Sequence, residues 1–427
     1  FVTRILERSP LLNASRQGSG SGGVTGNPAG IACGIDCSEA GYPPGSAITL
    51  TAAPDSHSQF RQWMGNGCPP SNPSCTLSTG ELFQTVAAYF RGAAVTAGLN
   101  DSFALKNDGT IAACGYNAYG ELGDGTTTHR FFPVPVMDLS QVVATVAGAY
   151  HTVALKEDGT VWTWGSNSIG ELGDGTTTNH SIPAQVTSLS DMVAVAAGGF
   201  IGKHTVALKS DGTVWTWGLN STGQLGDGTT TDRATPVQVT GLSQVVAIAA
   251  GGAYSLALRD DGTVWAWGSN TRNNLGDGAP SNRSTPVPVN GLLNVWNGVV
   301  AIAAGAAHTL ALQGDGTIWS WGYNTHGELG NGTMGVNQWL PLPVPTLSRV
   351  VAIAAGGYHS LALRDDGTVW TWGQNLRGQL GDGTTTDRAT PIQVAGLSGI
   401  VAIAAGYEHS LAIRSDGTMW GWGSNNY

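Results

Sequence analysis

Short apolar runs alternate with glycine-rich turns along most of this 427-residue chain, and the stretch from Val350 to Leu397 shows the pattern well. Each run is rich in Val, Ile, Leu, Trp and Thr and is too short for a typical helix, which favours β-strands. Asp366-Gly367 is a hairpin signal between the second run and the third. The sequence therefore predicts four strands in this stretch, at Val351–Ala355, Ser360–Arg364, Thr368–Trp372 and Pro391–Val394.

The same pattern recurs from about residue 92 onward, and an Asp-Gly-Thr triplet marks each copy. A repeat of about 50 residues indicates a solenoid, a propeller or an array. Seven four-stranded antiparallel units predict an all-β fold, a seven-bladed β-propeller, whereas an open β-solenoid would need shorter and more uniform rungs. The triplets begin at Asp108, Asp158, Asp211, Asp261, Asp315, Asp366 and Asp416, at intervals of 50, 53, 50, 54, 51 and 50 residues.

Side-chain size within one copy predicts how its strands are arranged. The first run alternates Val and Ile with Ala, and small side chains suit the crowded innermost strand of a radial fold. Trp370 and Trp372 are two residues apart, so both point to one face of their strand. We expect these rings to fill the space between neighbouring sheets.

The first part of the chain has a different composition. We divide the chain into an N-terminal arm with a Gly/Ser linker at 1–23, a small β-rich domain at 24–91 and the propeller at 92–427. The small domain contains strand-like runs at Ala47–Ala53, Gln59–Met64 and Gln84–Phe90.

Four of the five cysteines lie in this small domain and allow three pairings. We predict local disulfides Cys33–Cys37 and Cys68–Cys75, because each closes a short loop. The alternative is a zinc site made by all four, but the spacings of three and six intervening residues fit zinc ligands poorly. Disulfides favour an oxidising compartment, so we expect a secreted or cell-surface protein.

Charge limits the class of partner. Residues 1–91 contain five Arg and five acids, whereas residues 92–427 contain 14 Lys plus Arg and 24 acids, which gives the propeller the whole net charge of −10. An acidic propeller lacks the basic surface that phosphate binding requires, so we expect no nucleic-acid partner. No apolar run approaches the ~20 residues of a membrane-spanning helix, so we expect no transmembrane segment.

The pattern A-A-G-x-x-H-[ST]-L-A-L-x-x-D-G-T-V-W-x-W-G-x-N-x-x-G-Q-L-G-D-G resembles the repeat of the regulator-of-chromosome-condensation family, over residues 93–427. This resemblance implies the propeller fold. It leaves function open, because the family includes nucleotide exchange factors, a plant ultraviolet receptor, a secreted bacterial lactamase inhibitor and bacterial surface proteins. The receptor's Gly-Trp-Arg-His-Thr motif is absent here.

Residues 24–90 resemble a bacterial surface repeat domain of the internalin B-repeat-like kind. The paired cysteines, the Thr-Leu-Thr-Ala strand and an F-x-x-W element carry this resemblance. It implies a β-rich module of the type found in secreted bacterial proteins.

Two repeated features have a functional and a structural interpretation. Histidines recur at one repeat position, where they would be either metal ligands at the channel mouth or structural turn residues; we favour the structural role, since a site is normally made once. The Gly-Asp-Gly-Thr-Thr-Thr loops offer too few carboxylates for calcium, and turn chemistry accounts for them. The histidines are His151, His204, His308, His359 and His409.

No nucleophile–base–acid series or phosphate loop is visible, so we expect no catalytic site, no metal and no cofactor. A propeller hydrolase or lyase would need a single unrepeated acid/base cluster. Departures from the repeat are better candidates for partner binding, because exposed aromatic side chains often anchor protein interfaces. We expect those in blades 1, 3 and 5 to lie in loops on one face and Trp296 on the other; packing over a neighbouring blade is the alternative. The candidates are Phe131, Phe132, Phe200, Ile201, Lys203, Trp339, Leu340 and Trp296.

These observations predict a non-enzymatic bacterial protein, secreted or at the cell surface, that uses a propeller face to bind a protein or a surface glycan, or to self-assemble. The alternative is regulation of an enzyme, as a secreted inhibitor or, inside the cell, as a guanine-nucleotide exchange factor. The last copy stops at Tyr427, before its fourth strand. Either a segment such as Val2–Leu6 supplies that strand or the natural chain continues, and a start at Phe1 fits a processed or partial chain.

Overall fold

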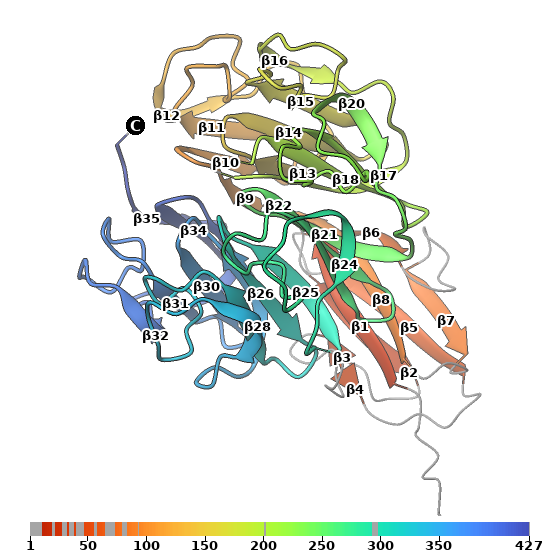
Figure 1. Cartoon of the computed structure of the whole chain (residues 1–427), viewed down its shortest axis with the longest axis vertical. Helices are drawn as coiled ribbons and strands as arrows, with labels where there is room; N and C mark the ends of the chain where they lie inside the picture. Colours follow the sequence, from red (N-terminus) through yellow and green to blue (C-terminus); the bar gives the residue numbers. More distant parts are fainter. Residues whose placement is uncertain are drawn as a thin grey trace, which may run out of the picture.

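A computed structural model contains seven radial β-sheets around a central channel (Figure 1). It describes residues 94–199, 202–292 and 298–426, together with the N-terminal strands given below and Pro73. Each sheet is antiparallel and contains one Asp-Gly-Thr triplet, so the predicted all-β, seven-bladed propeller is confirmed.

Each blade runs from its innermost to its outermost strand in chain order. Blade 1 contains β9 (Ala94–Ala97), β10 (Asp101–Leu105), β11 (Ile111–Gly115) and β12 (Arg130–Pro135). Blade 2 contains β13 (Val142–Ala147), β14 (His151–Lys156), β15 (Val161–Gly165) and β16 (His180–Gln185). Blade 3 contains β17 (Met192–Ala197), β18 (His204–Lys209), β19 (Val214–Gly218) and β20 (Arg233–Gln238). Blade 4 contains β21 (Val245–Ala250), β22 (Tyr254–Arg259), β23 (Val264–Gly268) and β24 (Arg283–Pro288).

The remaining blades follow the same order, except that the last is shorter. Blade 5 contains β25 (Val299–Ala304), β26 (His308–Gln313), β27 (Ile318–Gly322) and β28 (Gln338–Pro343). Blade 6 contains β29 (Val350–Ala355), β30 (His359–Arg364), β31 (Val369–Gly373) and β32 (Arg388–Gln393). Blade 7 contains β33 (Ile400–Ala405), β34 (His409–Arg414) and β35 (Met419–Gly423). In blade 6 the fourth strand begins three residues before the predicted Pro391, because Arg388 pairs with Gly373.

The turn between the second and third strands has the chemistry expected from its sequence. In blade 6 the Asp366 Oδ1 accepts hydrogen bonds from the backbone N–H and the hydroxyl of Thr368, at 3.0 and 2.6 Å. Gly367 has a φ of 75°, which glycine adopts readily. The carboxylate therefore closes its own turn without a metal ion.

The second tryptophan of each W-x-W pair ties its blade to the preceding one. Trp372 is fully buried, and its indole N–H donates to the carbonyl oxygen of Glu328 at 2.8 Å. Trp370 lies on the same strand face but is only half-buried. The predicted packing between sheets is thus confirmed, and Trp372 is the more deeply buried of the two rings.

The repeated histidines also join neighbouring blades. The Nε2 atom of each histidine shares a hydrogen bond with a Ser or Thr hydroxyl of the next blade. The histidines therefore have a structural role, and they connect two blades and not two strands of one blade. All five rings are at least half-buried, and burial lowers the pKa of each of these five, to about 3 for His204 and about 4 for His151. The pairs are His151–Thr205, His204–Ser255, His308–Ser360, His359–Ser410 and His409–Ser102, at 2.9 to 3.1 Å.

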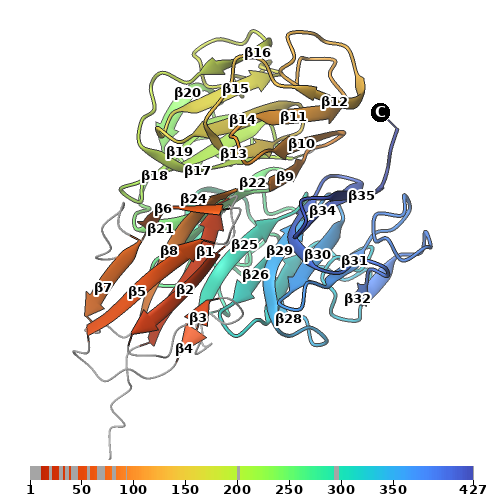
Figure 2. The ribbon, with the colours of Figure 1, turned by 180° about the vertical axis from the view of Figure 1, so that it is seen from behind.

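The N-terminal module, defined here as β1 to β8, forms two four-stranded sheets of order β4-β1-β8-β6 and β3-β2-β5-β7. Figures 1 and 2 both show these red and orange strands beside the blades that β21–β28 form. The first sheet contains β1 (Leu11–Gly18), β4 (Ser38–Glu39), β6 (Ser58–Met64) and β8 (Phe83–Gly92). The second contains β2 (Gly22–Asn27), β3 (Ala32–Cys33), β5 (Ala47–Pro54) and β7 (Ser74–Ser78).

The module includes part of the segment predicted to be an arm and linker. Leu11–Gly18 forms β1 and pairs in parallel with β8. β1 contacts β25 and β8 contacts β13, the innermost strands of blades 5 and 2. Since β8 leads directly into the start of β9, we place the module at the end of the channel where the innermost strands begin.

Cys75 is buried and disulfide-bonded. The side chains of Cys33, Cys37 and Cys68 lie outside the described residues. The pairing Cys33–Cys37 and Cys68–Cys75 therefore stays a prediction.

Candidate functional site

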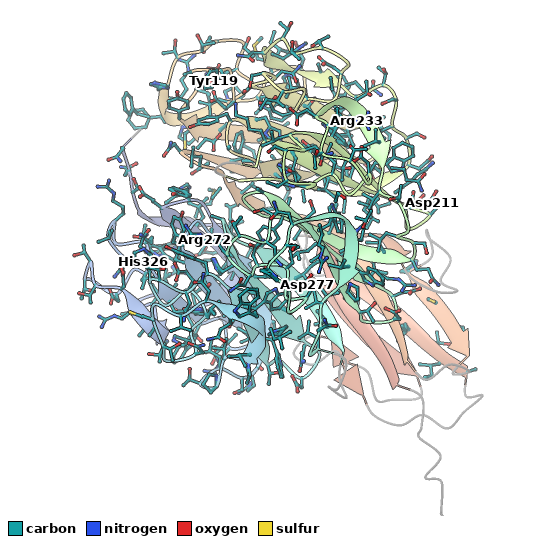
Figure 3. The ribbon with its side chains drawn as sticks, viewed as in Figure 1. Tyr119, Asp211, Arg233, Arg272, Asp277 and His326 are labelled. Atoms are coloured by element: carbon teal, nitrogen blue, oxygen red, sulfur yellow. The ribbon has the colours of Figure 1, made fainter. Side chains whose placement is uncertain are left out.

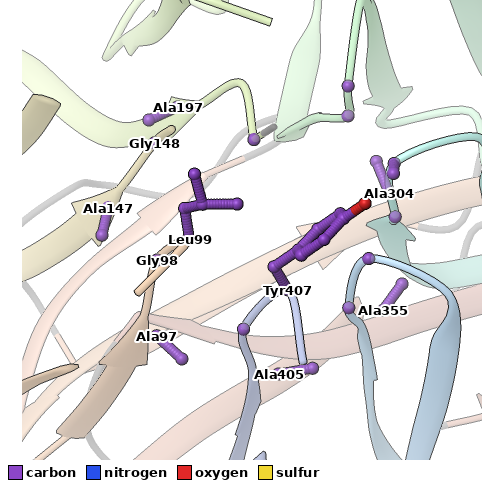
Figure 4. A pocket seen from close by; sticks show the side chains of 18 of the residues that line it. Ala97, Gly98, Leu99, Ala147, Gly148, Ala197, Ala304, Ala355, Ala405 and Tyr407 are labelled. Atoms are coloured by element: carbon purple, nitrogen blue, oxygen red, sulfur yellow. The ribbon is translucent and has the colours of Figure 1, made fainter. Parts of the chain in front are cut away.

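The opposite end of the channel opens on a face that we call the mouth face. It is formed by the loops that follow the innermost strands and by the loops that join the third strands to the fourth. A cavity of about 130 Å³ lies at its centre, lined by alanines and glycines, with Leu99 and Tyr407 as the large side chains (Figure 4).

The glycines at this opening are required by packing. A Cβ on Gly305 would lie within 2.6 Å of both His308 Nδ1 and the carbonyl oxygen of Gly356, in the next blade. The same crowding recurs around the opening, so the A-A-G sequence allows blades to approach closely. We call the contact between two neighbouring blades a seam. Backbone N–H groups donate hydrogen bonds across the seams, as from Tyr407 to the carbonyl oxygen of Gly98 at 3.1 Å.

A first aromatic cluster lies at the seam between blades 1 and 2. The rings of Tyr119 and Tyr150 meet edge to face at 5.4 Å, and Tyr116 lies 6.1 Å from Tyr150. Tyr116 also stacks on His129 at 4.7 Å. Tyr119, which Figure 3 labels, is 40% exposed, so this cluster reaches the surface.

A second aromatic cluster lies across blades 5 to 7. Tyr358 meets Tyr323 at 5.6 Å, Tyr407 at 5.7 Å and the His326 ring at 6.1 Å. The guanidinium of Arg272 from blade 4 lies over Tyr323 at 5.1 Å, a cation–π contact. Figure 3 labels Arg272 and His326. The two clusters flank the channel mouth.

A glutamate lies beneath each cluster, in the loop between the third and fourth strands. Glu121 and Glu328 are 1% and 0% exposed, and each accepts a backbone N–H of its own loop, from Tyr119 at 2.9 Å and His326 at 2.8 Å. Burial raises the pKa of each to about 7 despite these hydrogen bonds. The clusters therefore cover carboxyl groups that titrate near neutral pH.

The aspartates in the outer part of these loops are already satisfied by protein donors. Asp382 Oδ1 accepts from Thr384 and Asn375, and Oδ2 accepts from Arg388 at 2.6 Å. Among the residues that the structure describes, no group of three His, Cys, Asp or Glu side chains is arranged to hold a metal ion. Nor does any described helix have the length and apolar character to span a membrane.

Comparison with known proteins identifies the family. The RCC1-like domain model matches residues 193–427, more than half of the chain, and the regulator of chromosome condensation (RCC1) repeat model matches residues 108–155 and 158–208. The chain belongs to the RCC1-like domain family.

Curated RCC1-like relatives match parts of the chain. The mitochondrial RCC1 domain-containing protein RUG3 of Arabidopsis thaliana is 42% identical over 95 residues, 22% of this chain and 21% of RUG3. The ultraviolet-B receptor UVR8 of Arabidopsis thaliana is 30% identical over 193 residues, 44% of this chain and 43% of the receptor. The human E3 ubiquitin-protein ligase HERC2 is 35% identical over 192 residues, 44% of this chain but 4% of the ligase. The matches thus span less than half of each relative.

Solved structures support the RCC1-like fold. Human WBSCR16 has a TM-score of 0.67 and 22% identity, covering 84% of this chain and all of that one. Prp20p of Saccharomyces cerevisiae has a TM-score of 0.66 and 22% identity, covering 83% and 90%. At this identity the likeness concerns the fold alone.

The candidate residues from the sequence lie apart on the RCC1-like propeller. Phe131 and Phe132, 76% and 81% exposed, belong to outer strand β12, and Trp339 and Leu340 belong to β28. The expectation that these four residues lie in loops is wrong, because the fourth strand already begins at Arg130 in blade 1 and at Gln338 in blade 5. They form part of the outer rim.

The other candidates have different outcomes. Lys203 lies on the mouth face, where its Nζ is 3.0 Å from Ser168 Oγ and 3.7 Å from Glu171 Oε1. Phe200, Ile201 and Trp296 lie outside the described residues.

Sequence reasoning missed the tyrosine clusters. Their signal was present: blades 1 and 5 alone read Gly-Tyr-Asn after the W-x-W position, at Tyr116 and Tyr323, where the other copies have Ser, Leu or Gln.

Proposed function

We propose that this protein is a non-enzymatic binding platform whose mouth face docks a protein partner. The observation that carries the proposal is the pair of half-exposed tyrosine clusters that flank the channel mouth. Tyrosine, arginine and tryptophan dominate the energetics of protein interfaces. Because hydrogen bonds between blades hold the clusters on a closed ring, docking would require little ordering of the platform.

The nature of the partner is inferred from the RCC1-like fold. Prp20p of Saccharomyces cerevisiae is described as binding Gsp1p and histones, and this binding is a property of that protein. For the present chain we propose a protein partner by analogy of fold. Regulation of an enzyme would be one form of such binding, whereas a surface glycan or a second copy of the chain are outcomes that the experiment below separates.

The proposal includes a location. We propose that the N-terminal module is a bacterial surface repeat and that the protein is secreted or surface-bound. The cysteine cluster and the disulfide at Cys75 support this location. Alkylation of protein from its source checks this: four cysteines should react only after reduction. Reaction of all five without reduction would contradict an extracellular location.

Photo-crosslinking tests the binding face. A photoreactive amino acid is placed at Tyr119 or Leu376 on the mouth face, or at Ser210 in a turn at the opposite end. Leu376 is 63% exposed, so the substitution leaves the core intact. We expect both mouth-face positions, but not Ser210, to capture one and the same protein from native material. Capture from Ser210 alone, capture of the chain itself, or capture of glycan would overturn the proposal.

A further inference from the structure

One position in the loop between the third and fourth strands differs in charge from blade to blade. Its backbone carbonyl accepts the tryptophan N–H of the next blade, and its side chain lies under the mouth face. In blades 1 to 6 it is Glu121, Glu171, Gln224, Asn274, Glu328 and Gln379. Three seams thus contain a buried carboxyl group, and three contain an amide.

The carboxyl group of Glu171 is paired within the chain. Its Oε1 accepts from Ser166 Oγ at 2.9 Å and lies 3.7 Å from Nζ of Lys203, which belongs to the next blade. The same Nζ lies 5.8 Å from the centre of the Tyr150 ring. Lys203 therefore shows what this seam accommodates: an ammonium group between a tyrosine face and a buried carboxylate.

Glu121 lacks every one of these partners. At the positions equivalent to Ser166 and Lys203, blades 1 and 2 have Tyr116 and Tyr150. Its Oε2 is held by the N–H of Tyr119, but its buried Oε1 has no hydrogen-bond partner. Asp101 at the same seam is 4% exposed and also has an unpartnered oxygen, Oδ1.

Glu328 repeats this arrangement on the other side of the channel. Tyr323 and Tyr358 take the positions of Ser166 and Lys203, and the buried Oε1 again has no partner. The nearby His326 is engaged elsewhere, since its Nδ1 lies 2.8 Å from Asp387. Two seams thus share a half-exposed pair of tyrosines and a buried carboxyl group whose Oε1 has no hydrogen-bond partner.

We propose that Glu121 and Glu328 are receptor positions for two lysine side chains of the partner protein, each ammonium lying between the tyrosine rings and the carboxylate. This deepens the proposed function and rests on it. An unpaired buried carboxylate is costly, and a cation that reaches it gains both a charge-assisted hydrogen bond and a cation–π contact. Arg272 over Tyr323 shows that a ring of this cluster already attracts a cation.

Proton exchange supports the same assignment. With a pKa of about 7 for both glutamates, part of the population is protonated at neutral pH. A bound ammonium favours the ionised form, so binding at pH 7 should release protons.

The probe is a peptide with two lysines joined by glycine–serine linkers of graded length, titrated into the full chain by calorimetry in buffers of different ionisation enthalpy. We expect one linker length to bind best, with proton release. The same peptide with acetylated lysines should bind at least about tenfold more weakly. Equal binding of the acetylated peptide, or tighter binding of a two-arginine peptide, would overturn the proposal.

Glu121→Gln and Glu328→Gln are variants that the fold should tolerate, because Gln224 and Gln379 make the same loop hydrogen bond in blades 3 and 6. Each variant should bind the two-lysine peptide at least about tenfold more weakly than the parent chain does. Glu157→Gln, an equal charge change at the opposite end, is the control and should leave binding unchanged. Unchanged binding by both mouth-face variants would contradict the proposal.

Lys203→Ala provides a gain of binding. It removes the ammonium group from the carboxylate of Glu171, which keeps its contact with Ser166, so a peptide with one lysine should find a third site where the parent chain offers two. No added site would count against the ammonium assignment. If the double glutamine variant still crosslinks the partner through Tyr119 and Leu376, this inference fails while the proposed function stands; loss of crosslinking in the parent chain is failure of the proposed function itself.

Discussion

His409 Nε2 lies 3.1 Å from Ser102 Oγ, a contact between side chains 307 positions apart in the sequence. It joins the last blade to the first, and the Tyr407 N–H bond to the Gly98 carbonyl lies beside it. Blade 7 has three strands among the described residues, and these contacts join its inner strands to those of blade 1.

A double-mutant cycle measures this closure. His409→Ala and Ser102→Ala should each destabilise the chain by about 1 to 3 kcal/mol, because each removes one partner of a partly buried hydrogen bond. Their coupling energy should be about 1 kcal/mol. The cycle for His204 and Ser255, an interior seam, serves as the control. Denaturant unfolding supplies the values, and additive effects would contradict a closure role.

The seam between blades 1 and 2 lacks its histidine, because Asp101 stands at that position. Asp101→His should form the missing hydrogen bond with Thr152 and remove an unpaired buried carboxyl group, raising stability by about 1 to 3 kcal/mol at pH 7. Burial raises the pKa of Asp101 in the folded protein. The contribution of Asp101 to the free energy of unfolding is therefore fully present below its unfolded pKa and is lost as pH rises through its folded pKa. The gain should therefore grow with pH. Asp101→Asn is the control, and a less stable Asp101→His protein would contradict this prediction.

Acid should destabilise the ring below about pH 6.5. The folded pKa values of about 3 to 4 lie below the unfolded value of 6.5, so the histidines bind protons on unfolding. The contribution of these histidines to stability is fully present above pH 6.5. It is lost as pH falls, at a rate that approaches ~1.4 kcal/mol per pH unit for each histidine.

Two glutamates oppose this loss in the same pH range. Glu121 and Glu328, with pKa values raised to about 7, contribute stability that is present below pH 4.5 and is lost as pH rises through 7. The double variant Glu121→Gln/Glu328→Gln should therefore lose stability more steeply between pH 6.5 and 4.5. Urea titrations at several pH values check this, and parallel curves for the two proteins would contradict it.

Adjacent glycines on the mouth face should differ sharply in their tolerance to substitution. A Cβ on Gly198 would meet the Gly202 carbonyl oxygen and the His204 ring, whereas one on Gly199 meets nothing within 4 Å. Gly198→Ala should thus lower stability by about 1 to 3 kcal/mol, and Gly199→Ala should be neutral or slightly stabilising. Thermal unfolding of both variants checks the pair; similar melting temperatures would contradict the packing argument.

The sequence by itself determined the blade number, the strand pairs around each Asp-Gly-Thr turn and the burial of Trp372. These features depend on residues that are close in sequence, where strand periodicity and turn chemistry act directly. The tertiary structure alone decided what meets across a seam: the histidine bonds, the crowding that demands Gly305 and the tyrosines over Glu121 and Glu328. Partners such as His409 and Ser102 are far apart in the chain, and their contact depends on how the blades are arranged around the propeller axis. For the same reason Phe131, expected in a loop, lies on an outer strand, because the register from Arg130 to Gly115 sets where that strand begins.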